Sequence, residues 1–110
     1  MLGENNYAFM SIFDFKDNES KQKFLAAANS EIGIKKTRQY KGCISINIYN
    51  SRNSPNKIIM IQEWESKADK KSYLKMREEE GKLNLAFYQS LVKSPLELDL
   101  LSPININSKL

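Results

Sequence analysis

Residues 43–65 read CISINIYNSRNSPNKIIMIQEWE, and this stretch decides the fold. Isoleucine returns at every second position in its first part, which is the period of two of a β-strand. The segment from Asn50 to Asn56 contains Asn-Ser-Pro-Asn and has the composition of a turn. The residues from Lys57 to Glu65 are again rich in isoleucine and contain Trp64 next to their last residue. The stretch therefore predicts two antiparallel strands joined as a hairpin.

The residues before the hairpin predict a strand followed by a helix. Tyr7 to Phe15 is rich in aromatic and β-branched residues, as strands are. Asp17 and Asn18 then offer a helix N-cap, and apolar residues recur at helical spacing beyond them. We expect one helix that runs to about Lys36, with Gly33 weakening its end.

The residues after the hairpin predict two helices and a final strand. Ser66 suits the N-cap of a helix over Lys67 to Glu80, and Gly81 suits its end. A shorter helix follows, with Leu83, Phe87 and Leu91 on one face, and it ends at Ser94-Pro95. Leu96 to Leu101 alternates leucine with acidic residues and predicts the last strand.

The element order is β-α-β-β-α-(α)-β, which is the split βαβ arrangement of ferredoxin-like α+β domains with an antiparallel sheet. A chain of 110 residues is long enough for one core, so we expect a single domain over 1–110. The ordered part is expected over about residues 7–104, with 105–110 as a loose tail.

Both faces of the predicted sheet are apolar. In the first strand Phe9 and Phe13 point one way while Met10 and Ile12 point the other, and the third strand has isoleucines on both faces. Crossovers of this topology place the helices on one face only. An uncovered apolar face would be a large adhesive patch, so we expect a second copy of the sheet to cover it. The sequence therefore predicts a homodimer.

Composition excludes several classes of function. The chain has no histidine and a single cysteine, Cys43, so it cannot assemble the usual zinc sites or a histidine-dependent nucleophile. We therefore expect no metal and no other cofactor. The lone cysteine, together with the lack of a signal peptide or membrane span, favours a cytoplasmic protein without a membrane partner. A net charge of +4 is mild, and the third strand lacks the motif of RNA-recognition domains, so we expect no nucleic-acid partner.

The stretch TRQYKGCISINIYNSRNSPNKIIMIQEWESKADKKSYLKM, residues 37–76, resembles the central signature of the antibiotic biosynthesis monooxygenase family. That signature has a turn of the type Arg-x-x-x-Gly-Cys before a strand, then a hairpin, then Glu-Trp-x-Ser before a helix. The matching residues are Arg38, Gly42, Cys43, Tyr49, Glu63, Trp64 and Ser66. The closing PLELDLLSPI, residues 95–104, also resembles the family's final strand.

The resemblance implies a dimeric α/β barrel with an apolar pocket in each subunit, between the sheet and its helices. Some family members oxidise aromatic polyketides or quinols with oxygen and no cofactor, whereas others degrade haem, isomerise sugars or have no established activity. Many members place a histidine nine residues after the tryptophan, where this chain has Tyr73. The haem-degrading members use an Asn, Trp and His set that this chain lacks.

Six residues are candidates for the site that the resemblance implies. Tyr73, Asn47 and Tyr49 are the catalytic candidates, since their side chains can position or protonate a substrate oxygen. Each could instead be an ordinary packing or surface residue. For substrate binding, the candidates are Trp64, Arg77 and Phe13, whose alternative roles are core or interface packing and a surface ion pair. We expect Trp64, Tyr49, Asn47 and Tyr73 to converge on one cavity.

The leading functional hypothesis is a cofactor-independent monooxygenase that acts on a small aromatic or quinol-like molecule. The alternative is a non-catalytic small-molecule-binding protein, or an isomerase-type protein, with the same barrel.

Overall fold

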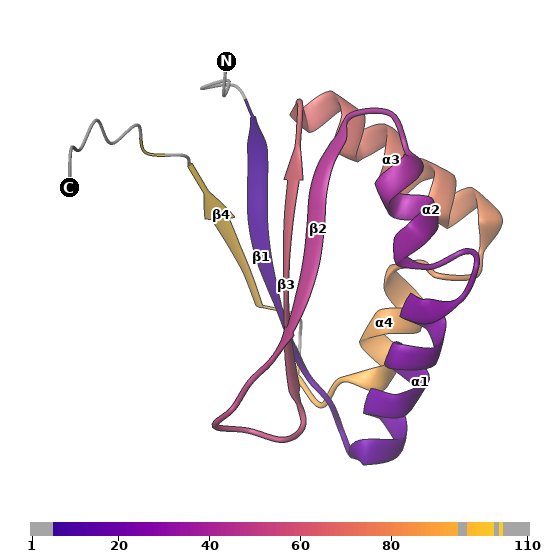
Figure 1. Ribbon diagram of the computed structural model, residues 1–110. Helices are drawn as coiled ribbons and strands as arrows, with labels where there is room; N and C mark the ends of the chain where they lie inside the picture. Colours follow the sequence, from indigo (N-terminus) through magenta and orange to yellow (C-terminus); the bar gives the residue numbers. More distant parts are fainter. Residues whose placement is uncertain (1–5, 95–96, 103, 105–110) are drawn as a thin grey trace.

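A computed structural model describes residues 6–94, 97–102 and 104, and it confirms the predicted α+β ferredoxin-like fold (Figure 1). The eight elements are listed here in chain order: β1 Tyr7–Asp14, α1 Asn18–Asn29, α2 Ile34–Gln39, β2 Cys43–Asn50, β3 Lys57–Trp64, α3 Lys67–Glu80, α4 Leu85–Leu91 and β4 Glu97–Leu101. The expected loose tail at 105–110 lies outside the described residues, as does Leu96, the first residue of the expected last strand.

The sheet has the order β2-β3-β1-β4, and all neighbouring strands are antiparallel. The two central strands pair in continuous register from Tyr7 opposite Trp64 to Asp14 opposite Lys57. All four helices lie on one side of the sheet (Figure 1). Within the described residues, no helix is long and apolar enough to cross a membrane.

The segment after β1 differs from the expectation of one helix to about Lys36. α1 ends at Asn29, and Ser30 closes it by donating from both its backbone N and its Oγ to the carbonyl of Ala27. Gly33 then lies so close to α1 that a Cβ atom there would be 2.2 Å from the Ala27 oxygen. The chain therefore bends at residues 30–33 and starts the separate helix α2, because local hydrogen bonds and the close approach at Gly33 outweigh the helical periodicity.

The core between the sheet and the helices has two parts. One part is built around the rings of Phe13, Phe15 and Phe24 and extends to β2 and α4. The other is smaller and consists of Phe9, Trp64 and Tyr73 under α3. The candidate site lies in this second part.

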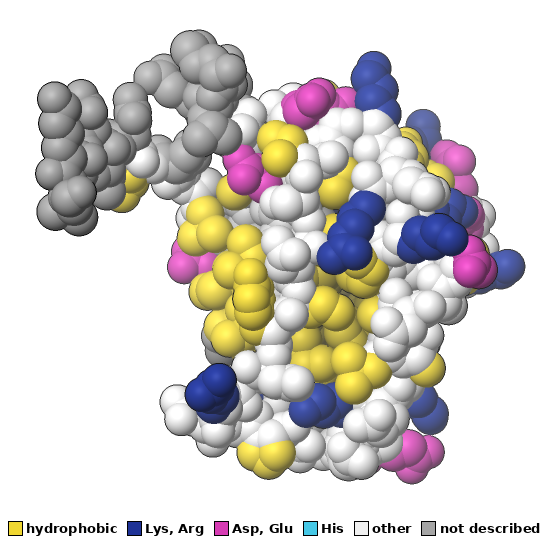
Figure 2. Space-filling view, in the orientation of Figure 1, with side chains coloured by type: hydrophobic (Ala, Val, Ile, Leu, Met, Phe, Trp, Pro, Cys, Tyr) yellow, Lys and Arg dark blue, Asp and Glu magenta, His cyan; other side chains and the backbone are white. Residues whose placement is uncertain are grey.

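The opposite face of the sheet carries no helix. Met10, Ile12, Ile59 and Ile61 lie on it, and each is only partly buried. In Figure 2 hydrophobic side chains gather over the strands on the side away from the helices. The prediction that both faces of the sheet are apolar is confirmed.

Candidate functional site

The site is built around Trp64, the last residue of β3, which is 0% exposed. Its Nε1 donates a hydrogen bond of 2.9 Å to Oε1 of Gln62, which lies on the same face of the strand. α3 begins shortly after β3 because Ser66 caps it, accepting a hydrogen bond from the backbone N of Asp69. α3 then brings the ring of Tyr73 to 5.0 Å from that of Trp64, centroid to centroid.

Lys70 lies one helical turn before Tyr73, and its side chain is buried between α3 and the sheet, with 8% of its surface exposed. Its Nζ donates to Gln62 Oε1 at 3.1 Å. The same Nζ is 4.2 Å from the ring centroid of Phe9, 5.3 Å from that of Tyr73 and 5.7 Å from that of Trp64. We call these five residues the lysine cage: Lys70, Gln62, Phe9, Trp64 and Tyr73.

The electrostatics of the lysine cage are unusual. In the part of the chain that the structure describes, Lys70 forms no ion pair with a carboxylate. Loss of hydration on burial lowers the pKa of Lys70 from 10.5 to about 7, although the neighbouring Cys43 opposes this shift. Burial in turn raises the pKa of the Cys43 thiol. The amine of Lys70 can therefore gain or lose a proton near neutral pH, as an acid–base group must.

Arg77 is 3% exposed and lies beside the cage, but its donors are engaged within the protein. Its Nε donates to the Tyr73 hydroxyl at 2.8 Å, and its terminal nitrogens donate to the carbonyls of Ile32 and Gly33 and to Thr37 Oγ1. Arg77 thus ties α3 to the bend between α1 and α2, where the Gly33 carbonyl also accepts from the backbone N and the Oγ1 of Thr37. Four of its five N–H groups are used in this way, so the arrangement does not support the expectation that Arg77 binds substrate.

The hydroxyl of Tyr73 belongs to the same network. It lies 2.7 Å from Thr37 Oγ1 and accepts from Arg77, so it is directed toward α2. What Tyr73 offers the lysine cage is its ring, which is tilted against Trp64, meets Tyr40 in a T-shaped contact and has Lys70 Nζ 5.3 Å from its centroid. A role for its hydroxyl in catalysis would require this network to open.

Asn47 and Tyr49 do not join Trp64 and Tyr73, so the expected convergence of the four residues is wrong. Asn47 pairs with Ile61, and Tyr49, which is 52% exposed, pairs with Ile59. Both therefore lie on the face of the sheet that carries no helix. The reason is that the isoleucines of β2 at positions 46 and 48 pack into the core, which turns the intervening residues outward.

Phe13 shares the helix side of β1 with Phe9 but belongs to the other part of the core, where its ring centroid is 4.9 Å from that of Phe24. Of the six candidates, then, Trp64 and Tyr73 lie in the cage and Arg77 lies next to it. Sequence reasoning missed Lys70, Gln62 and Phe9. The signal was available for Lys70, since residues 70, 73 and 77 have the i, i+3, i+7 spacing of one helix face.

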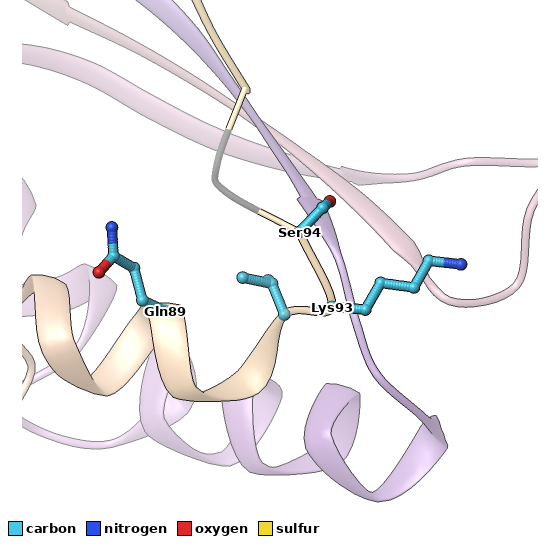
Figure 3. A pocket seen from close by; sticks show the side chains of 4 residues that line it. Gln89, Lys93 and Ser94 are labelled. Atoms are coloured by element: carbon cyan, nitrogen blue, oxygen red, sulfur yellow. The ribbon is translucent and has the colours of Figure 1, made fainter.

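Two surface depressions lie away from the cage. One is lined by Gln89, Val92, Lys93 and Ser94 at the end of α4, and Figure 3 shows Gln89 and Lys93 pointing in different directions. The other lies between α1, α2 and β2, where Lys35 is paired with Glu31 and Arg38 donates to the Ile46 carbonyl. Neither gathers side chains around a common point as the lysine cage does.

Comparison with known proteins now identifies the family. Residues 16–78, more than half of the chain, match the model of the family described as antibiotic biosynthesis monooxygenase. The chain belongs to this family. The match includes β2, β3 and most of α3, and hence four of the five cage residues. No curated protein sequence matches the chain.

Several solved structures share the fold at low sequence identity. A putative antibiotic biosynthesis monooxygenase from Bacteroides thetaiotaomicron is 22% identical, with a TM-score of 0.70 and 97% of each chain covered. A monooxygenase from the gene ActVA-Orf6 of Streptomyces coelicolor, solved with the ligand nanaomycin D, is 15% identical, with a TM-score of 0.73 and coverage of 97% of this chain and 95% of that one. A dimeric ferredoxin-like protein from an uncultured marine organism is also 15% identical, with a TM-score of 0.70 and coverage of 96% and 94%.

Proposed function

We propose that this member of the antibiotic biosynthesis monooxygenase family oxidises a small aromatic or quinol-like molecule at the lysine cage, without a metal or flavin. The observation that carries the proposal is the cage itself, in which three aromatic rings surround one amine that titrates near neutral pH. Aromatic rings suit a flat apolar substrate, and the amine suits a group that must lose a proton before it reacts with oxygen.

Composition supports the cofactor-free part of the proposal. The chain has no histidine and one cysteine, so the nitrogen and sulfur ligands of common transition-metal sites are missing from its sequence. The Streptomyces coelicolor relative, a monooxygenase solved with nanaomycin D, supports a small-molecule substrate.

We also propose that the working form is a homodimer. Met10, Ile12, Ile59 and Ile61 form an apolar surface on the face without helices, and a second copy of that face would cover it. The dimeric relative from the uncultured marine organism has the same fold. In such a dimer Asn47 and Tyr49 would lie toward the partner subunit, and the lysine cage would remain within each subunit.

The test is oxygen uptake with a panel of quinols and polycyclic phenols. Oxygen consumption that requires both protein and substrate is expected, and it should persist after exhaustive treatment with chelators. Trp64→Phe keeps an apolar ring but removes the indole N–H that anchors Gln62, so it should reduce uptake. Tyr49→Phe, on the opposite face, is the matched control and should leave uptake unchanged.

Binding of the same compounds without oxygen consumption would overturn the proposed reaction and favour the non-catalytic binding protein. Equal uptake by Trp64→Phe and the parent protein would show that the reaction does not depend on the geometry of the cage.

A further inference from the structure

We propose that the lysine cage selects ligands with an acidic hydroxyl, and that Lys70 Nζ takes the hydroxyl proton and holds the resulting phenolate or enolate as an ion pair. This inference rests on the proposed function, because it names the substrate class and the residue that ionises it. Its test separates the two.

The argument starts from the missing counter-ion. A buried ammonium group is normally paired with a carboxylate, since burial of an unpaired charge is costly. In the described part of the chain, Lys70 has only the neutral amide of Gln62 and the faces of aromatic rings as partners. An ammonium group has three N–H donors, and one hydrogen bond to Gln62 leaves the others without an oxygen acceptor. A ligand oxygen that carries negative charge would supply both the counter-ion and the hydrogen-bond acceptor that Lys70 lacks.

Among the residues that the structure describes, no neighbouring carboxylate takes that place. The side chains around the cage that carry an ionisable group are Cys43 on β2, Tyr7 on β1, Tyr40 before β2 and Tyr73 on α3, and the first three pack against the same cluster. Glu63, on β3 next to Trp64, lies on the other face and accepts from Asn6. Asp69 on α3 accepts from Ser66. The carboxyl groups of Glu63 and Asp69 thus have partners away from Lys70, so the Lys70 amine is left for a ligand.

The cage is closed by its own side chains, and the part of the sheet beside it with least cover is β4. Phe9 pairs with Leu100 of β4 across the sheet, so both lie on the helix face. Leu100 is nevertheless 67% exposed, because the helices do not cover this edge of the sheet. Phe9 itself is 6% exposed and Lys70 Nζ lies over its ring, so a flat ligand that enters over β4 would have to displace Nζ in order to stack on Phe9. The unbranched side chain of Lys70 can move its Nζ to the ligand oxygen.

The proposed step is a proton transfer that conserves atoms and charge. A neutral ligand hydroxyl and the neutral amine of Lys70 become a phenolate or enolate and an ammonium group, with no electrons exchanged. The reverse transfer restores the amine when the ligand leaves as a neutral molecule. The anion is more electron-rich than the parent phenol, which suits the later reaction with oxygen.

The experiment uses 4-nitrophenol, whose phenolate absorbs at a longer wavelength than the phenol. The probe is titrated with the full-length protein at slightly acidic pH, where the free probe is mostly neutral. We expect bound probe to show the phenolate band. In Lys70→Met the band should be absent, and phenolate affinity at mildly alkaline pH should fall by about 30-fold or more, the loss typical of removing one partner of a buried charge pair. Lys70→Arg retains a charge and should restore phenolate affinity.

Lys71→Met is the matched control, because Lys71 is the exposed neighbour on α3 and its loss should leave the band unchanged. Bound probe that stays neutral in the parent protein, or a phenolate band that survives in Lys70→Met, would overturn the inference. If oxygen uptake with quinols persists in that case, the proposed function stands without this role for Lys70. A phenolate band without any oxygen uptake would support the role of Lys70 in ionising the ligand and would overturn the proposed oxidation.

Discussion

Replacement of Lys70 by methionine should stabilise the protein, and the gain should depend on pH. Methionine is unbranched and similar in length, so it can fill the space between α3 and the rings of the lysine cage. It removes the cost of keeping an amine away from water. The substitution loses the hydrogen bond to Gln62, but that loss is a neutral-group effect that varies little with pH.

The magnitude follows from the two pKa values. The folded-state pKa of Lys70 is about 7, below its ordinary value of 10.5, so the unfolded chain binds more protons between these values. Stability that depends on this group therefore rises as the pH rises from about 7 toward 10.5 and is constant below about 7. In the parent protein the free-energy cost of burying the Lys70 ammonium applies in full at pH ~6 and is smaller by about 2–3 kcal/mol at pH ~9. The advantage of Lys70→Met should shrink by the same amount.

The assay is urea denaturation of the parent protein and Lys70→Met at several pH values between about 6 and 9, with Lys71→Met as the exposed control. Taking the difference between the two proteins at each pH cancels the titrating groups that do not interact with Lys70, and a Cys43→Ser background removes the contribution of the one thiol that does. A difference in unfolding free energy that stays constant over this range would refute the reasoning, since it would mean that Lys70 keeps an ordinary pKa. A strongly destabilised variant at every pH would show that the ammonium contributes packing or pairing that the structure does not reveal.

Three further predictions follow from the network, the turns and the sheet face. Arg77→Met should lower the unfolding free energy by about 3–5 kcal/mol, since it removes four hydrogen bonds from a buried guanidinium and leaves the Ile32 carbonyl without this donor, whereas Lys75→Met on the exposed side of α3 should change it little by the same urea assay. Gly81→Ala should lower the unfolding free energy by about 1–2 kcal/mol, because its φ is positive. Gly42→Ala should lower it more, because its Cβ would also lie 2.4 Å from Asp69 Cγ. Equal decreases in the melting temperatures of the two variants would contradict this. Met10→Asp should convert a dimer into monomers in light scattering, and a parent protein that already has the 12.7 kDa mass of one chain would disprove the proposed dimer.

The sequence was most informative where local signals and tertiary packing agree. The strand periodicity of residues 43–65 and the cap at Ser66 predicted β2, β3 and α3, and the bounds of α3 are the expected ones. The sequence was misleading at residues 30–33. The helical spacing of apolar residues continues there, but α1 ends at Asn29 and α2 begins at Ile34. At the bend, Arg77 donates to the carbonyls of Ile32 and Gly33, and it lies 44 residues away from Gly33. A long-range contact of this kind leaves no mark in local periodicity.

The site was predicted only in part, for a related reason. Trp64 and Tyr73 were found through the family signature, and both belong to the lysine cage. Asn47 and Tyr49 were chosen because they share a strand face, but the period of two does not say which face meets the helices. Lys70 shares a helix face with Tyr73 and Arg77, but lysine is almost always exposed, so this spacing alone does not indicate a buried amine.

The cost of burying Lys70 bears on whether the lysine cage has a function. A pKa lowered from 10.5 to about 7 corresponds to about 5 kcal/mol of penalty on the charged form. The free energy of unfolding of a domain is only about 5–15 kcal/mol, so this penalty is a substantial fraction of it. An apolar residue at position 70 would avoid the penalty and pack against the same rings. Groups retained at such a cost are concentrated at functional sites, where a perturbed pKa is what the chemistry requires. Two results are therefore expected for Lys70→Met: a pH-dependent gain in stability and the loss of the phenolate band. Both would report the same property, which is the lowered pKa of the buried amine that we propose ionises a ligand.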